Sequence, residues 1–199
     1  MEYKITFKNF CKHLRRTLRH KWYVFLWCCK AGMPIRGLLH DLSKFSPVEF
    51  WESVRYFSDS ESPINVSKRA NGYSKAWQHH KGHNPHHYEY WIDQLDYGGK
   101  PIQMPKKYAY EMICDYLGAG QAYNPKGWTF EKEYKWWLNR LDTCEGMAMN
   151  EYTKRFVSMV LGVLGREKSE YYKDQYKRSL GVLLDMCWNS IEESKKHDC

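Results

Sequence analysis

The stretch Gly37-Leu38-Leu39-His40-Asp41-Leu42-Ser43-Lys44-Phe45 is the one around which the rest of the chain is organised. An apolar run leads into the adjacent His40-Asp41 pair, and Lys44 follows three residues later. A histidine and an aspartate at the end of a helix can both turn toward one metal ion. A nearby ammonium group suits an anionic ligand such as a phosphate. His-Asp dipeptides are common, so the meaning of this pair depends on the segments around it.

The segment before this stretch predicts a long helix over residues 5–31. Its second half, from Trp22 onward, is apolar on all sides, which predicts a central, buried position. The residues that follow a three–four spacing, and so are expected on one buried face, are Phe7, Phe10, Cys11, Leu14, Leu18, Trp22, Phe25 and Cys29.

A short helix is predicted next, because Gly32 ends the first helix and Pro34 suits the first turn of another. We expect this short helix to be buried through Ile35, Leu38, Leu39 and Leu42 and to aim His40 and Asp41 near its end. Ser46-Pro47-Val48-Glu49 then forms a capping box that opens a helix from 47 to about 57. This explains Glu49 as architecture, so it is not counted as catalytic.

The remaining segments also favour helices, and no alternating strand pattern is visible. The predicted class is therefore all-α, a single domain over residues 1–199, with C-terminal helices from 128–199 packing on the core. Loops are expected at 58–72, 96–104 and 119–127, and helices at 73–81, 85–95, 105–117, 129–142, 150–165 and 168–196.

Composition limits the partners. The 199 residues carry a net charge of +8, which favours anionic partners such as nucleotides, nucleic acid or phosphoesters, or is only a soluble basic surface. Seven cysteines without a Cys-x-x-Cys motif predict buried thiols in a reducing cytoplasm. The longest apolar run, 22–29, is too short to span a bilayer, so no membrane partner is expected. A homo-oligomer is compatible with the sequence.

A histidine cluster completes a candidate metal site. Five of the nine histidines, at positions 79, 80, 83, 86 and 87, lie within nine residues, and Asp115 falls on a later helix with Glu111 four residues before it. Four helices thus offer ligands, as in helix bundles that hold metals in their cores. Histidine with carboxylate and no cysteine suits Fe, Mn, Zn, Co or Ni, as one or two ions. His13 is assigned to the surface, and His83 is left open.

These motifs resemble the HD-domain superfamily of metal-dependent phosphohydrolases. The segment His40-Asp41-Leu42-Ser43-Lys44 is similar to its His-Asp-x-x-Lys form. Three segments resemble more closely an uncharacterised HD-like family of bacteria and phages: His20-Lys21-x-x-Val24, His40 through Phe50, and His79-His80 with Asn84-x-His86-His87-x-Glu89. With the Glu111-x-x-x-Asp115 helix, the resemblance covers about residues 15–120.

The resemblance implies a helix bundle and roles for particular residues. His20, His40, Asp41 and Asp115 would be the core metal set, and His80 with His86 or His87 would hold a second ion. Lys44 would contact phosphate, with His79 and His83 as further candidates for substrate binding. From its place one turn before Asp115, Glu111 would orient water or act as a base, or else it is an exposed helix acid or supports a ligand histidine.

Three functions remain open at this point. The first is a metal-dependent phosphohydrolase that acts on a nucleotide or a related small phosphoester. The second is a protein that sequesters such a ligand without turnover, with Trp77, Tyr88 and Trp91 either stacking on a base or packing in the core. The third is a nucleic-acid binder that uses Arg15, Arg16, Arg19 and Lys21, and no recognition motif accompanies that charge.

Overall fold

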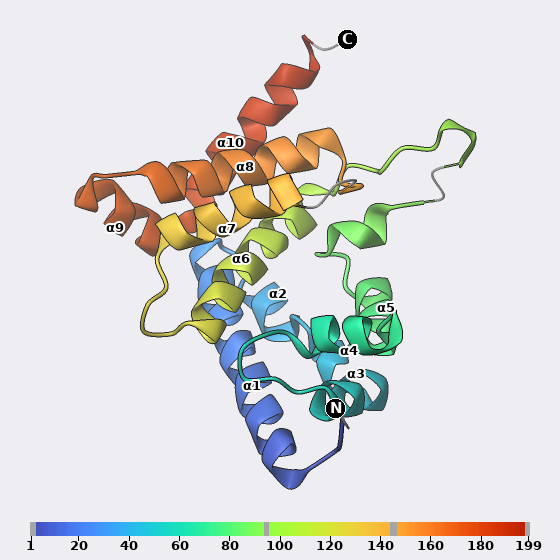
Figure 1. Ribbon diagram of the computed structural model, residues 1–199. Helices are drawn as coiled ribbons and strands as arrows, with labels where there is room; N and C mark the ends of the chain where they lie inside the picture. The colour runs from blue at the N-terminus through green and yellow to red at the C-terminus, as the bar shows by residue number, and fades with distance from the viewer. Residues whose placement is uncertain (1–2, 94–95, 144–146, 198–199) are drawn as a thin grey trace.

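The computed structural model describes residues 3–93, 96–143 and 147–197, and these residues form helices and loops without a strand (Figure 1). The predicted all-α class is therefore confirmed. The helices are α1 (Phe7–Lys30), α2 (Pro34–Leu39), η1 (Leu42–Phe45), α3 (Pro47–Arg55), α4 (Pro63–Asn71), α5 (Lys75–His83), η2 (Tyr88–Trp91), η3 (Asp96–Gly98), α6 (Lys106–Tyr123), α7 (Phe130–Thr143), α8 (Glu151–Arg166), α9 (Glu170–Arg178) and α10 (Leu180–Lys195). Within the described residues, no helix is both long enough and apolar enough to cross a membrane.

Local capping sets several of these boundaries. The Thr6 hydroxyl accepts a hydrogen bond from the Asn9 amide at the start of α1, and Ser46 accepts one from the Glu49 amide at the start of α3. The predicted Ser46 cap is thus confirmed. The reciprocal half of the capping box is not formed, because the Glu49 carboxylate turns away to His79 and His80.

The long helices α1 and α6 pack against each other and carry the centre of the protein. Val24 on α1 and Met112, Ile113 and Leu117 on α6 are fully buried. Close approach is possible because residue 118 is a glycine: a Cβ there would lie 2.5 Å from Val24 Cγ2 and 2.8 Å from the Val24 nitrogen. Helices α7, α8 and α10 cover the other side of α6 and complete the core (Figure 1).

Gly118→Ala is therefore expected to destabilise the protein by about 3 kcal/mol, because the added methyl group has no space between two packed backbones. Urea unfolding followed by circular dichroism measures the change. Gly82→Ala is the matched control: Gly82 is also helical, but a Cβ there meets nothing within 4 Å. That substitution is expected to stabilise by about 0.5–1 kcal/mol, and equal effects at both glycines would contradict the close approach of α1 and α6.

The sequence-based boundaries were wrong in five places. The 58–72 segment contains α4, with Ser62 as its cap and Pro63 at its first position. The predicted helix 85–95 is only the short η2, and its residues 94–95 lie outside the described part of the chain. Helices α5 and α6 continue through Gly82 and Gly118 instead of ending there. The predicted 168–196 helix is two helices that meet at Ser179.

The predicted buried faces of α1 and α2 were also wrong. The buried residues of α1 are His13, Thr17, His20, Val24, Trp27 and Cys28. Trp22 is instead 58% exposed, and His13, expected at the surface, is 8% exposed. On α2 only Gly37 is buried, against Cys28 and Phe25, whereas Ile35, Leu38 and Leu39, and Leu42 after them, are exposed. The polar face of α1 turns inward because it lines the site described below.

The cysteines agree in part with the expectation of buried thiols. Cys28, Cys114 and Cys187 are free and buried, whereas Cys11 and Cys29 are free and exposed. Cys144 and Cys199 lie outside the described residues.

Candidate metal centre

The turn between α2 and η1 presents His40 and Asp41 side by side toward the interior. Asp41 adopts a left-handed backbone conformation, with φ 54° and ψ 31°, and it is the one residue other than glycine with positive φ among those described. Aspartate tolerates this region better than most residues. Lys21 on α1 donates hydrogen bonds to the carbonyl oxygens of Leu38 and His40, which fixes the turn against α1. Both side chains are consequently buried, each with 1% exposure.

A first group of four ligand atoms includes one carboxylate oxygen of Asp41. The Nε2 atoms of His20 and His40 each lie 3.2 Å from Asp41 Oδ2. Asp115 Oδ1, from the middle of α6, lies 3.2 Å from His20 Nε2 and 3.5 Å from His40 Nε2. We call His20, His40, Asp41 and Asp115 the first group. Its members come from α1, the turn after α2, and α6.

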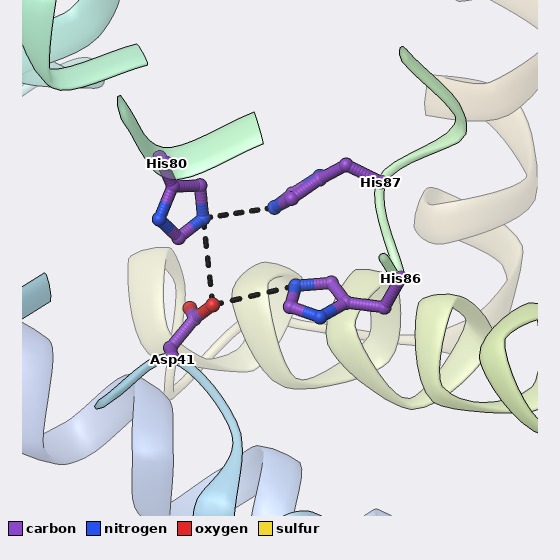
Figure 2. Close-up of side chains that lie close together, drawn as sticks. All are labelled: Asp41, His80, His86 and His87. Carbon is purple, nitrogen blue, oxygen red and sulfur yellow. Dashed lines mark hydrogen bonds and ion pairs between the residues drawn. The ribbon is translucent and has the colours of Figure 1, made fainter. Parts of the chain in front are cut away.

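A second group surrounds the other carboxylate oxygen of the same aspartate (Figure 2). Asp41 Oδ1 lies 3.4 Å from His80 Nε2 and 3.3 Å from His86 Nε2. His87 Nε2 lies 2.8 Å from His80 Nε2. His80 belongs to the end of α5, and His86 and His87 belong to the loop that follows it. We call Asp41, His80, His86 and His87 the second group, and Asp41 is shared by both groups.

Carboxylates behind the histidines fix which ring nitrogen faces inward. Glu111 Oε1 lies 3.0 Å from His40 Nδ1 and 3.4 Å from His86 Nδ1, and its other oxygen pairs with Arg36. Glu49 Oε2 lies 2.7 Å from His80 Nδ1. A carboxylate on Nδ1 leaves Nε2 as the inward ligand atom, an arrangement typical of metal-binding histidines. Glu111 therefore contacts His40 and His86 from behind. This favours a role in supporting the ligand histidines over a role as a base.

Several inward atoms have ion-pair contacts within the site but make no hydrogen bond. Among the described residues, His40 Nε2, Asp41 Oδ1 and His86 Nε2 are fully buried and make no hydrogen bond. Burying a polar atom without a partner is costly. These three atoms lie among the residues whose ligand atoms are close enough together to hold a metal ion.

The spacing of the donors matches a small divalent ion. Ligands about 2.1 Å from a central ion stand about 3.4 Å apart in a tetrahedron and about 3.0 Å apart in an octahedron. The contacts within the first group run from 3.2 to 3.5 Å. All ligand atoms of each group lie within 4.8 Å of one another. Both groups therefore have residue types and spacing that can hold a metal ion.

Without metal, the charges of the site balance among themselves. Burial would raise the pKa of Asp41, but His40, Lys44 and His80 hold it well below its ordinary value. Burial would likewise lower the pKa of His40, but the Asp41, Asp115 and Glu111 carboxylates hold it well above. Burial and the neighbouring His86 and His80 lower the pKa of His87 well below its ordinary value, which favours the neutral imidazole form that metal binding requires.

The predicted site residues divide into two sets. His20, His40, Asp41, His80, His86, His87 and Asp115 converge, and Lys44 Nζ pairs with Asp41 Oδ2 beside them. His79 and His83 do not converge. His79 pairs with Glu49. The His83 ring stacks on the His79 ring, with 4.0 Å between the ring centroids, and its Nδ1 lies against the His79 carbonyl oxygen. Sequence reasoning missed Glu49, because its place in a capping box already explained its presence.

Two cavities open beside the centre. One of about 500 Å³ is lined by Arg36, His40, Asp41, His86 and Glu111 among others. The other, of about 180 Å³, is lined by His20, Lys44, His80, His87 and Asp115, with Trp77 and Tyr123 as aromatic walls. Members of both groups thus border a space that a small ligand can enter.

Glu49→Gln is expected to weaken metal binding at the second group by about 10–100-fold, because an amide no longer accepts from both His79 and His80. Isothermal titration of the metal-free protein with Co²⁺ or Zn²⁺ measures the change. Glu52→Gln is the matched control on the same helix, since the Glu52 carboxylate accepts from Ser67 and Ser74 instead. Equal affinities in wild type and Glu49→Gln would contradict the supporting role of Glu49.

Comparisons with known proteins point to one family. Residues 9–162 match a family of unknown function, DUF5662. No curated protein and no solved structure matches the chain. The matched segment contains every residue of the two groups and extends into α8. The chain therefore belongs to the DUF5662 family of unknown function.

Proposed function

We propose that the protein is a metal-dependent phosphohydrolase of the HD type, acting on a nucleotide or a related small phosphoester. The observation that carries the proposal is the sharing of Asp41. One of its oxygens faces the other members of the first group, and the other faces the three histidines of the second group. A carboxylate between two sets of donors is what a two-metal hydrolytic site requires.

The residues would divide their work as follows. The first group would hold one divalent transition metal (Mn, Fe, Co, Ni or Zn), and the second group would hold another. Such ions supply Lewis acidity and lower the pKa of a bound water to about 7 in favourable cases. Glu111 and Glu49 orient the ligand histidines from behind. Burial of the whole set excludes bulk water from the donors.

Lys44 is the residue best placed to meet the anionic part of a substrate. Its ammonium group lies in the smaller cavity, next to the first group. Asp41 and Asp115 raise its pKa against the opposing effect of burial, so it stays charged. A fixed positive charge there stabilises negative charge on phosphoryl oxygens as it builds.

The size of the smaller cavity limits the substrate. Its volume is about 180 Å³, below the roughly 300–1,000 Å³ of sites that enclose a whole drug-sized ligand. We therefore expect the phosphoryl end to be enclosed and the rest of the substrate to extend outward past Trp77 and Tyr123. The free cysteines of the described residues support a reducing, cytoplasmic setting for this activity.

A phosphate-release assay tests the proposal. The purified protein is loaded with Mn²⁺, Fe²⁺, Co²⁺ or Ni²⁺ and incubated with nucleoside mono-, di- and triphosphates and cyclic nucleotides, with the Asp41→Asn variant as the control. We expect release of phosphate, or of a nucleoside monophosphate from cyclic substrates, that the variant lacks. Tight binding of an intact ligand, seen by mass spectrometry, would show that the protein sequesters the ligand and does not hydrolyse it. Inert behaviour with every metal and ligand would refute both.

A further inference from the structure

An exposed apolar face lies on the opposite side of the turn that carries the candidate centre. It consists of Trp22 on α1, Ile35, Leu38 and Leu39 on α2, Leu42 on η1 and Val48 on α3. Their exposed fractions are 58%, 74%, 65%, 58%, 53% and 48%. Single exposed apolar residues are ordinary, but six large ones on consecutive elements are not.

The members on α1 and α2 lie side by side. Helix α2 lies directly on α1, because a Cβ on Gly37 would lie 2.6 Å from Cys28 Cβ and 3.0 Å from Phe25 Cα. The Trp22 ring contacts the Phe25 ring at 5.9 Å, and Lys21 beside it reaches the Leu38 carbonyl oxygen. Trp22 therefore borders the outer side of α2. Leu42 on η1 and Val48 on α3 are exposed on the two elements that follow α2 in the chain.

The area of this face is that of a protein interface. The exposed fractions correspond to roughly 750 Å², above the roughly 300–600 Å² of the largest patch on a typical monomer. A partner in a standard interface contributes about 800 Å². Leaving this much apolar surface in water is unfavourable, because burial stabilises by about 25 cal/mol per Å².

The nearby charges argue for a dry protein contact over a lipid surface or a nucleic acid. The three cations closest in sequence to the face are turned inward: Lys21 to the His40 carbonyl oxygen, Arg36 to Glu111, and Lys44 to Asp41. A surface that binds lipid headgroups or phosphates would direct such groups outward. The centre of the face thus offers methyl groups and an indole without outward charge, as the core of a homodimer interface does.

We propose that the apolar face is the interface of a homodimer, in which a second copy of this chain covers α2 of the first. A two-fold arrangement suits a single self-complementary patch, because the same residues serve both partners. Leu39 and Leu42 flank His40 and Asp41 directly. The partner therefore packs on the outer side of the turn whose inner side carries the shared aspartate.

Sedimentation velocity of the full-length protein tests the interface. The chain has a mass of 24.0 kDa, and the wild type is expected to sediment at twice that mass. Ile35→Glu combined with Leu38→Glu should weaken dimerisation at least about 100-fold, because the two charges would be buried without partners. Both side chains point into solvent in a single chain, so this variant is expected to keep the circular dichroism spectrum of the wild type.

A matched variant and a second measurement keep the outcomes distinct. Val182→Glu combined with Met186→Glu places the same charges at exposed apolar positions of α10, 53% and 61% exposed, and is expected to remain a dimer. A monomeric wild type, or dimers in the Ile35/Leu38 variant, would overturn the proposal. A monomeric wild type that co-sediments with phosphatidylserine vesicles would assign the face to lipid instead. Unfolding of the Ile35/Leu38 variant, with a wild type that stays folded as a monomer on dilution, would also contradict it, since the two results together require these side chains to be buried within one chain.

Discussion

Asp41→Asn is expected to remove both metal ions from the protein and to abolish any phosphohydrolase activity. The substitution removes the negative charge that both groups share, and it turns one of the two ligand oxygens into an amide nitrogen, which cannot bind a divalent cation. Changing a residue that only supports a ligand already costs about 10–100-fold in metal affinity, so loss of a shared ligand should exceed about 100-fold at each group. Metal content after gel filtration, measured by plasma mass spectrometry, should fall from two equivalents to none.

Asparagine is the right replacement because the backbone at residue 41 has φ 54°. Asparagine adopts this left-handed region about as readily as aspartate does, whereas alanine would add backbone strain to the loss of the carboxylate. Lys44→Met controls for the lost Asp41–Lys44 ion pair and is expected to retain metal. An Asp41→Asn protein that keeps two equivalents of metal would show that Asp41 is not shared.

Removal of Asp115 or His87 is expected to separate the two groups. Asp115 belongs only to the first and His87 only to the second, so Asp115→Asn and His87→Gln should each lower the metal content from two equivalents to one. The remaining ion should be held by the second group in Asp115→Asn and by the first group in His87→Gln. With Co²⁺, the visible absorption spectrum reports the ligand set, so the two spectra should differ and should sum approximately to that of the wild type.

The activities of these two variants are expected to fall together. A phosphoryl transfer that uses both ions loses most of its rate when either is absent, so each variant should retain under about 1% of the wild-type rate if the proposed function holds. Loss of both ions in either variant would indicate one combined site in place of two groups. Full activity with one ion would limit catalysis to a single metal.

The sequence singled out most of the residues that converge, because the ligand types themselves are informative. His20, His40, Asp41 and Asp115 stand on or beside helices whose apolar neighbours predict burial, and helix packing alone does not require the dense cluster from His79 to His87. The convergence of these residues depends on tertiary packing, and its geometry emerges only when α1, α2, α5 and α6 are placed together.

The errors have a common physical origin. Apolar spacing predicts that a residue avoids water, but it does not identify what covers that residue. On α1 it favoured the face with Leu18 and Trp22, whereas the structure buries His13, Thr17 and His20, which line the smaller cavity beside the centre. On α2 it placed Ile35 and Leu38 in the core of one chain. If the proposed dimer forms, the same pattern is satisfied by a second chain.

Glu49 shows a different limit. A capping box accounts for a glutamate at the third position of a helix, and the Ser46 cap is indeed formed. The carboxylate nevertheless reaches His79 and His80, which lie some thirty residues later in the chain. A local role that is sufficient to account for a residue does not exclude a long-range contact, and only the three-dimensional structure reveals it.

Metal content of the purified wild-type protein tests the proposed two-metal centre most directly. The protein is expressed without added chelator, passed through gel filtration, and analysed for Mn, Fe, Co, Ni and Zn against protein concentration from amino-acid analysis. We expect close to two equivalents of transition metal per chain, or restoration to two when the depleted protein is supplied with Mn²⁺ or Co²⁺. A protein that holds no metal as purified and takes up none on addition would contradict the two-metal centre.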